Sequence, residues 1–553
     1  MPEQISTSDK TFRATLILAT PLFLAGLWHF ISSPYAIAGD TAMYLQCGQL
    51  LLQGKLPYLD LLELNPPLIM YVSMIPAMLS KACSLPLALA GALSTSSLAL
   101  LAYALTAGGT RMVLKSLELN QVDGQIIIAP ALFAPILLNA LSMFDFGQRE
   151  HLYSLFLLPF FLLRYARLID SRNENSINYS LNERLFSVIV GLTLGLTACF
   201  KPLFLLGPVT LELYWLVKYR KPSLLFRPEI LAAPLPMILY ALSFLLLPAE
   251  VRTTYFGEVV PLLVKGYSCF NIIRDVMVKW IWSFALTSYL IALLFVGVIR
   301  KDLALRAPLA IMLSTALAII ELQQKFWNYH AIPLYLWESF IIIFGITASI
   351  QKSQRKAVKA MMIGLLLLTI VAIQFGSALL QLQIERNWPR PWEQYLAKHA
   401  RAGESVLLLD TSDTPWFKSA LRFNLVPGSR HLWLYTIPML QYQIDHGRAK
   451  DRERARAELA IFFSELGKEI DSRKPKYILL KRKEASGMAP SLDFQKYLLE
   501  NGLEKPLLQY RTIEDYDEAV LLGRKPDLVK PSGKAGEVRS KFGQPCSPLP
   551  TTR

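Results

Sequence analysis

Long apolar runs constrain this chain more than any other feature of its sequence. Eleven of them lie between residues 11 and 382, each close to the length of a membrane-spanning helix. The hydrocarbon core of a bilayer requires about 20 residues of helix, because backbone amides find no water there and must pair within the segment. We therefore predict eleven transmembrane helices. They cover residues 11–32, 85–107, 125–143, 152–168, 185–200, 203–217, 229–247, 276–298, 305–322, 331–350 and 360–382.

The distribution of positive charge predicts the orientation of these helices. The formal net charge is +15, but the lysines and arginines gather in short connections between apolar runs, which is typical of membrane topology rather than of nucleic-acid binding. The basic connections lie near residues 10–13, 111–115, 164–172, 218–227, 300–301 and 352–359. We expect all of them on the cytoplasmic side of a bacterial inner membrane, with no nucleic acid as partner.

Residues 66–80, PPLIMYVSMIPAMLS, are apolar but short and begin with two prolines. We predict that this segment dips into the membrane and returns, or lies along its surface, because every basic loop then falls on one side. The alternative is a full crossing with an unrecognised second crossing elsewhere. With the first choice, residues 34–65, 144–151, 250–275 and 323–330 and the C-terminal region are extracytoplasmic.

The composition changes abruptly after residue 382. Short strand-like runs at 405–410, 476–480 and 519–522 alternate with helix-like stretches such as 452–470. We therefore predict a membrane domain at 1–382, an extracytoplasmic soluble α/β domain at 383–524, and a disordered tail rich in proline and glycine at 525–553. The five cysteines form no CxxC motif, so we expect neither a disulfide framework nor a structural metal.

Polar residues concentrate on the predicted outer face, where a lipid headgroup meets water. The first outer loop places Asp40 at the start of an amphipathic helical stretch and Asp60 and Glu63 before the double proline. Asp40 is either a helix N-cap, a position that Asp favours, or a functional carboxylate.

The second outer loop, FDFGQREHL, contains Asp145, Arg149, Glu150 and His151 between two apolar helices. These residues form either an intraloop ion pair with a histidine cap, or an acid with phosphate-binding donors. We favour the second interpretation.

Two further outer connections carry cations and aromatic rings. Lys201 either extends its ammonium group to the membrane–water interface without a functional role or presents it to a lipid phosphate. The stretch ELQQKFWNYHAIP contains Lys325, Trp327, Tyr329 and His330, which form either an interfacial aromatic belt or a sugar-stacking wall.

These residues resemble the GT-C superfamily of membrane glycosyltransferases, particularly the family-39-like group of protein O-mannosyltransferases and lipid A aminoarabinose transferases. The resemblance covers about residues 11–382 and depends on GDxxxY (Gly39, Asp40, Tyr44), on a Pro-Pro-Leu segment after Glu63, and on an acidic second outer loop. Relatives in the lipid A branch carry a Glu-Lys pair directly before the prolines, where this chain has Leu64 and Asn65.

The resemblance implies a polytopic α-helical protein that transfers a sugar from a polyprenyl-phosphate donor to an envelope lipid, glycan or protein. It assigns to Asp40 the role of base, which suits a reaction in which an acceptor hydroxyl loses its proton. It leaves open whether a divalent metal is used. We expect catalytic roles for Asp40, Glu63 and Asp145. We expect substrate binding by Tyr44, Arg149, Glu150, His151, Lys201, Tyr329 and His330.

A polytopic transporter or lipid flippase is the alternative. Glu212 and Glu338 are its candidate intramembrane acids, but the sequence shows no repeat, which such proteins usually have. A non-catalytic assembly or sensory protein is a further alternative, although eleven helices exceed what anchoring requires.

Overall fold

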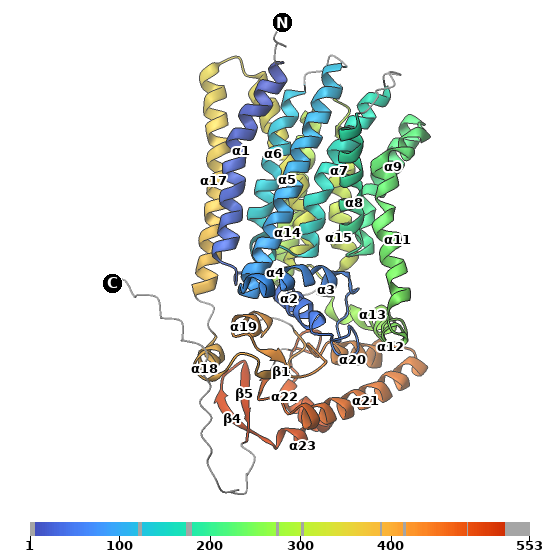
Figure 1. The fold of residues 1–553 in the computed structure, drawn as a ribbon, viewed down its shortest axis with the longest axis vertical. Helices are drawn as coiled ribbons and strands as arrows, with labels where there is room; N and C mark the ends of the chain where they lie inside the picture. Colours follow the sequence, from blue (N-terminus) through green and yellow to red (C-terminus); the bar gives the residue numbers. More distant parts are fainter. Residues whose placement is uncertain are drawn as a thin grey trace, which may run out of the picture.

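A helical bundle and a smaller sheet-containing region lie at opposite ends of the molecule (Figure 1). The computed structural model describes residues 6–119, 124–172, 180–271, 276–299, 303–386, 390–412, 416–483 and 485–525. The predicted disordered tail lies outside these residues, except for Lys525.

The bundle contains the long helices, together with short turns at their ends. The long helices are α1 (Thr7–Ser32), α5 (Leu87–Leu119), α6 (Ile128–Ser142), α7 (Arg149–Arg172), α8 (Leu181–Ala198), α9 (Leu206–Tyr219), α14 (Val276–Val298), α15 (Arg306–Gln323), α16 (Ile332–Lys352) and α17 (Lys356–Arg386). The turns are η1 (Gln125–Ile127), η2 (Met143–Asp145), η3 (Pro202–Leu205), η4 (Pro222–Phe226) and η9 (Asn328–Ala331). After η4 the chain forms one more helix, which is interrupted near Pro234 and consists of α10 (Pro228–Ala232), α11 (Pro234–Ser243) and η5 (Phe244–Leu246).

Within the described residues, nine helical segments are long and apolar enough to cross a membrane. They correspond to nine of the eleven predicted spans. The predicted span at 203–217 forms α9, which has only 14 residues. The predicted span at 276–298 forms α14, of which residues 285–297 were assessed as a shorter apolar helix. The chain is thus a multi-pass membrane protein.

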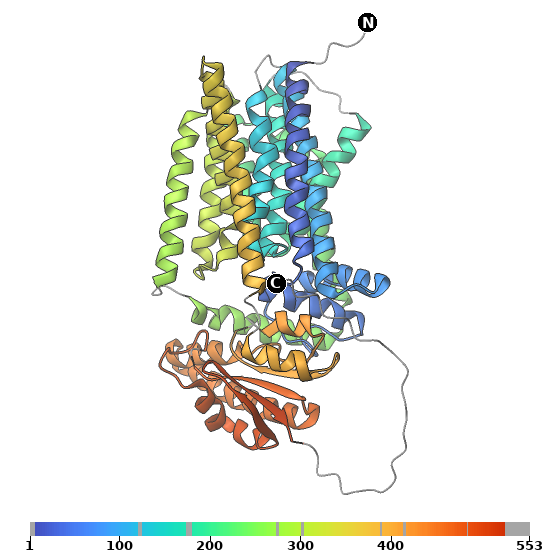
Figure 2. The same ribbon diagram turned by 90° about the vertical axis from the view of Figure 1, so that its left-hand side faces the viewer.

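Three short helices lie across one end of the bundle: α2 (Gly39–Leu52), α3 (Leu68–Val72) and α4 (Met74–Cys83) (Figures 1 and 2). The segment 66–80 therefore does not run the length of the bundle. Helix α2 approaches the start of α4 so closely that a Cβ on Gly48 would lie 2.2 Å from the Ser73 carbonyl oxygen. Gln46 of α2 is buried and donates to the Leu425 carbonyl at 3.5 Å.

A further helical segment lies between the bundle and the C-terminal region (Figure 1). It consists of α12 (Ala249–Thr254), the π-helical turn η6 (Tyr255–Val259), α13 (Val260–Gly266) and η7 (Tyr267–Phe270). The C-terminal helices are α18 (Pro391–His399), α19 (Trp416–Arg422), α20 (Thr436–His446), α21 (Ala449–Arg473), α22 (Phe494–Leu498), η10 (Leu499–Leu503) and α23 (Glu504–Leu507).

A five-stranded mixed sheet forms the centre of the C-terminal region, in the order β2-β1-β3-β5-β4. Its strands are β1 (Ser405–Leu409), β2 (Val426–Pro427), β3 (Tyr477–Lys481), β4 (Tyr510–Asp515) and β5 (Ala519–Arg524). Strand β1 pairs in parallel with β2 and β3, whereas β5 is antiparallel to β3 and β4. The sequence predicted β1, β3 and β5, whose apolar runs are buried, but not the two-residue β2 or the more exposed β4.

One predicted cytoplasmic loop is instead part of a helix. Helix α7 continues to Arg172, and the side chains of Arg164 and Arg167 are fully buried. Arg164 makes two 2.7 Å hydrogen bonds to Glu212 and one of 2.8 Å to Glu229. These two arginines were therefore wrongly read as loop charges: acidic partners on α9 and α10 compensate them inside the protein.

Candidate functional site

A cavity of about 420 Å³ lies where the bundle meets the C-terminal region. Its walls come from α2, the loop before α3, the start of α7, the segment before α16, and the C-terminal region. Five predicted site residues line it: Asp40, Glu63, Asp145, Arg149 and Tyr329. Residues almost 300 positions apart in the sequence thus share one cavity.

The first and second predicted outer loops are joined directly beside this cavity. The Ala38 backbone N–H donates to the Phe144 carbonyl at 2.7 Å, and Phe30 stacks on Phe146 with ring centroids 3.8 Å apart. Gly147 has φ +90°, a conformation that favours glycine, and allows the chain to turn into α7. As a result, the first turn of α7 lies next to the first turn of α2.

Asp40 is not the N-cap of α2. That position is Ala38, which makes no side-chain capping bond, and Asp40 lies in the first turn. A carboxylate is favoured there by the positive end of the helix dipole. Its Oδ2 lies 3.9 Å from an Arg149 guanidinium nitrogen, and its side chain is 21% exposed, so it faces both a cation and the cavity.

Arg149 is held in place by three neighbours of different types. It lies in the first turn of α7 rather than in a loop, and its side chain is only 3% exposed. Its guanidinium donates to the side-chain carbonyl of Asn65 and lies 5.5 Å from the centre of the Tyr44 ring. Asn65 in turn donates to the Tyr44 hydroxyl at 2.7 Å. The cation is therefore oriented by uncharged groups, with Asp40 as a more distant counter-ion.

Glu63 is a fully buried carboxylate that contacts both parts of the molecule. One oxygen accepts hydrogen bonds from Asn65 and from Tyr44, the latter at 3.4 Å, and the other accepts from Trp433 Nε1 at 3.1 Å. Burial raises the pKa of Glu63, whereas the hydrogen bonds from Asn65 and Trp433 act in the opposite direction. Trp433 belongs to the C-terminal region, so this bond connects that region to the cavity wall.

The other predicted site residues do not line this cavity. Lys201 is paired with Glu150, donates to Gln323 at 2.9 Å, and lies 5.3 Å from the Tyr329 ring centre. Burial lowers the pKa of Lys201 to about 8. The Lys201–Glu150 pair thus lies behind Tyr329, not on the cavity surface.

Both predicted site histidines are buried against neighbouring side chains. His151 bonds with Asn139 at 2.9 Å and accepts from the Gly147 backbone N–H at 3.3 Å. His330 packs edge-on to Tyr329, with ring centroids 4.6 Å apart. These contacts suit a structural role, in which His151 holds the start of α7 and His330 holds the turn before α16 near the cavity.

The predicted site residues do not include four polar residues that line the cavity: Asn65, Lys325, Lys418 and Trp433. Lys325 donates to Asn271 and lies 4.3 Å from the Tyr267 ring centre. Burial lowers the pKa of Lys325 to about 8. Asn65 and Lys325 lie in outer segments that the sequence analysis did single out. Lys418 and Trp433 lie in the C-terminal region, where no sequence motif pointed to them.

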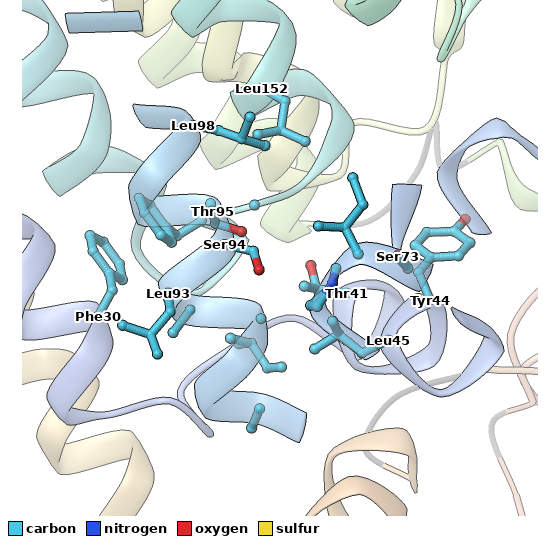
Figure 3. Close-up of a pocket in the computed structure, with 18 of the residues that line it drawn as sticks. Phe30, Thr41, Tyr44, Leu45, Ser73, Leu93, Ser94, Thr95, Leu98 and Leu152 are labelled. Atoms are coloured by element: carbon cyan, nitrogen blue, oxygen red, sulfur yellow. The ribbon is translucent and has the colours of Figure 1, made fainter. Parts of the chain in front are cut away.

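A second cavity, of about 430 Å³, adjoins the first at Gln148, which lines both. It lies between α1, α2, α4 and α5, and its lining is mostly apolar, including Phe30, Leu45, Leu98 and Leu152 (Figure 3). The few polar groups around it are hydroxyls such as Thr41 and Tyr44. An apolar cavity thus lies directly next to the charged one.

The donors at the charged cavity do not match a divalent-metal site. Among the described residues, no three His, Cys, Asp or Glu side chains are grouped as metal ligands. Both oxygens of Glu63 already accept hydrogen bonds, and Asp40 faces a guanidinium. The reaction proposed below therefore uses no metal-dependent step.

No known family model matches the chain, and no curated protein matches its sequence. Among solved structures, it is similar to ArnT from Cupriavidus metallidurans, whose crystal structure contains undecaprenyl phosphate. The identity is 12% and the TM-score 0.51, and the match covers 93% of this chain and 99% of ArnT. An Archaeoglobus fulgidus oligosaccharyltransferase, crystallised with Zn and sulfate, matches at 12% identity and a TM-score of 0.40 over 90% of this chain and 71% of its own. That TM-score is too low to support an inference.

The similarity to ArnT extends over the bundle and the C-terminal region together, as its coverage of both chains requires. It confirms the predicted fold class, a polytopic helical bundle followed by a small α/β region. The chain therefore shares the overall fold of that structure, in agreement with the fold class expected from the sequence.

Proposed function

We propose that this protein is a glycosyltransferase that moves a sugar from a polyprenyl-phosphate donor to a hydroxyl group of an envelope lipid, glycan or protein. The observation that carries the proposal is the placement of Asp40 beside Arg149 in one cavity at the end of the bundle. A carboxylate next to an oriented cation can accept a proton while a phosphate leaves.

In the proposed reaction, the acceptor hydroxyl attacks the anomeric carbon of the donor sugar. The new bond joins the acceptor oxygen to that carbon, and the bond from the carbon to the phosphate oxygen breaks. Asp40 takes the hydroxyl proton, and the bonding electrons leave with the polyprenyl phosphate. Arg149 and Lys325, two cations that line the cavity, stabilise the charge of that leaving group.

The remaining cavity residues position these groups. Glu63 and Asn65 fix Tyr44 and Arg149 through the hydrogen bonds described above, and Tyr329 offers an aromatic face to the sugar. Lys201 and Glu150 act behind Tyr329 as a buried pair. Asp145 lies in the same cavity as Asp40 and is the second candidate carboxylate.

The apolar cavity beside the charged one suits the prenyl chain of such a donor. Its mostly hydrocarbon lining suits a lipid tail, while the phosphate stays with the cations of the charged cavity. The undecaprenyl phosphate in the ArnT crystal structure supports this choice of donor by analogy of fold.

The proposed location is a bacterial inner membrane with the C-terminal region outside the cell. The α1 start and the α16–α17 connection, both near clustered lysines and arginines, lie at the bundle end far from the sheet (Figure 1). By the positive-inside rule that end is cytoplasmic. The C-terminal α/β domain at 383–524 would then cover the site from the extracytoplasmic side and contact it through Trp433.

The decisive test compares Asp40→Asn with Asp60→Asn in a deletion strain, with glycolipid and envelope-glycan profiles as the readout. Asp60 belongs to the same loop but accepts from the Leu56 backbone N–H at 2.9 Å and does not line the cavity. We expect Asp40→Asn to reduce transfer by roughly 10²- to 10⁴-fold at normal protein level, and Asp60→Asn to behave as wild type.

Full transfer activity with Asp40→Asn contradicts the assignment of Asp40 as the base, whereas a deletion strain whose glycolipid and envelope-glycan profiles are unchanged contradicts the transferase proposal. That outcome would direct attention to the transporter or flippase alternative. The structure gives the alternative no specific support, since Glu212 is paired with Arg164 and Glu338 accepts a 2.7 Å hydrogen bond from Ser288.

A further inference from the structure

A third cavity, of about 470 Å³, lies between the α12–α13 segment and the helices α20 and α21. It is separated from the charged cavity by a thin wall in which the Leu62 backbone N–H donates to the Arg430 carbonyl at 2.7 Å. Leu62 and His431 line the third cavity, whereas the adjacent Glu63 and the nearby Trp433 line the charged one. The two cavities are therefore distinct spaces on either side of one wall.

Charged side chains line the third cavity as ion pairs. Arg430 contacts Glu465 at 2.7 Å, and Arg454 contacts Glu458 at 2.6 Å. All four residues line the cavity, so it offers many hydrogen-bond donors and acceptors while the paired charges cancel. A neutral ligand with several hydroxyl groups can bond to both members of such pairs, whereas an ion would be attracted by one and repelled by the other.

His431 supplies the second observation that points to a ligand. It is 6% exposed, its ring packs edge-on against Phe462 at 4.8 Å, and neither ring nitrogen has a hydrogen-bond partner. Burial lowers the pKa of His431 to about 3, so the ring is neutral and has one donor and one acceptor. Buried polar atoms without partners are costly and rare in folded proteins, and a ligand hydroxyl would satisfy them.

The local backbone is also unusual at this cavity. The π-helical turn Tyr255–Val259 interrupts the α12–α13 segment, and Gly257 and Glu258 of that turn line the cavity. Single π-helical turns are rare and occur frequently at functional sites. The aromatic ring of Phe462 adds an apolar face of the kind that packs against the ring of a sugar.

We infer that this third cavity is a saccharide-binding site that takes an uncharged sugar unit, such as a hexose or N-acetylhexosamine of a glycan. The binding does not depend on the transfer reaction proposed above, because it uses none of the residues of the charged cavity. The site lies where a glycan approaching the membrane surface from outside would meet the C-terminal region.

The test uses the full chain in lipid nanodiscs on a printed array of neutral hexose and N-acetylhexosamine oligosaccharides and of acidic ones. We compare wild type with His431→Leu, Arg454→Ala and Glu458→Ala. His446→Leu is the matched control, since His446 is an exposed histidine of α20 that does not line the cavity. Asp40→Asn is included to separate this site from transfer.

We expect wild type, His446→Leu and Asp40→Asn to bind neutral glycans equally. His431→Leu should weaken binding roughly tenfold. Arg454→Ala and Glu458→Ala, the two rim variants, should each weaken it severalfold. The side chains of Arg454 and Glu458 are 63% and 41% exposed, so these two variants decide the matter even where His431→Leu fails to fold. Absence of neutral-glycan binding, preference for acidic glycans, or binding unchanged in both rim variants would each overturn the inference.

Discussion

Two of the clusters that contain arginine and carboxylate side chains are built differently. The closed cluster consists of Arg164, Arg167, Glu212 and Glu229, near the end of the bundle far from the sheet. The open cluster consists of Asp40, Glu63, Asn65 and Arg149, at the end near the sheet. Both contain arginine and carboxylate, yet only the open cluster lines a cavity among those described.

The contact distances explain the contrast. In the closed cluster, Arg164 makes bidentate 2.7 Å bonds to Glu212, a third bond to Glu229, and one of 3.1 Å to the Leu224 carbonyl. In the open cluster, the Arg149–Asp40 separation is 3.9 Å and Asp40 faces the cavity. The closed cluster satisfies its charges within the fold, whereas the open cluster leaves part of its charge available to a ligand.

The largest effect is expected for Arg164→Ala, which breaks the closed cluster. Glu212 would lose its cation and the buried Glu229 would keep only Arg167 at 3.4 Å. Breaking comparable buried pairs costs roughly 3–5 kcal/mol of folding free energy. Denaturant unfolding of the purified protein measures it. Lys218→Ala, an exposed cation on the neighbouring helix α9, is the control. Equal stability of the two variants would show that the closed cluster does not hold the helices together.

Arg149→Ala should have the opposite profile, with a fold that is retained and a reaction that is lost. The loss of a cation that stabilises a leaving group lowers kcat/KM by roughly 10²- to 10³-fold. Steady-state transfer assays and unfolding curves on the same preparation check both halves. A large stability loss with normal kcat/KM would remove the distinction between the clusters.

Trp433→Phe sharpens the comparison by testing whether the C-terminal region supports the open cluster. The change deletes the 3.1 Å hydrogen bond to Glu63 and keeps most of the ring, so we expect roughly a tenfold fall in kcat/KM. Trp416→Phe serves as the control, because Trp416 packs on Trp392 away from the cavity. That variant should lose stability without loss of kcat/KM; the reverse pattern would contradict the proposed coupling.

The smallest effect concerns the alkaline pH dependence of donor use. Because burial lowers the pKa of Lys325 to about 8, its ammonium is charged below that pH and neutral above it. We therefore expect kcat/KM to fall severalfold as the pH rises through about 8 in wild type, and the fall to vanish in Lys325→Arg, which stays charged.

The pKa of Lys201 is also about 8, so it provides an internal check. A fall that persists in Lys325→Arg would assign the titration to the Lys201–Glu150 pair behind Tyr329. In that case the second phosphate-binding cation would have been misidentified.

Much of the fold follows from local rules that the sequence displays directly. Apolar runs of membrane length must be helical, since every backbone amide needs a partner within its own segment, and β1, β3 and β5 follow from buried apolar runs. Asp40, Glu63 and Arg149 could be selected from the sequence as candidate site residues, because charged groups beside membrane-spanning helices are costly and often functional.

The sequence by itself determined the helical membrane architecture and the polar residues at one end of it. Only the tertiary structure decided which polar residues pair with each other: Lys201 with Glu150, Arg164 with Glu212, and Trp433 with Glu63 across 370 positions. The physical reason is that hydrophobicity and helix geometry act over neighbouring residues, whereas the partner of a buried charge is fixed by packing between distant segments.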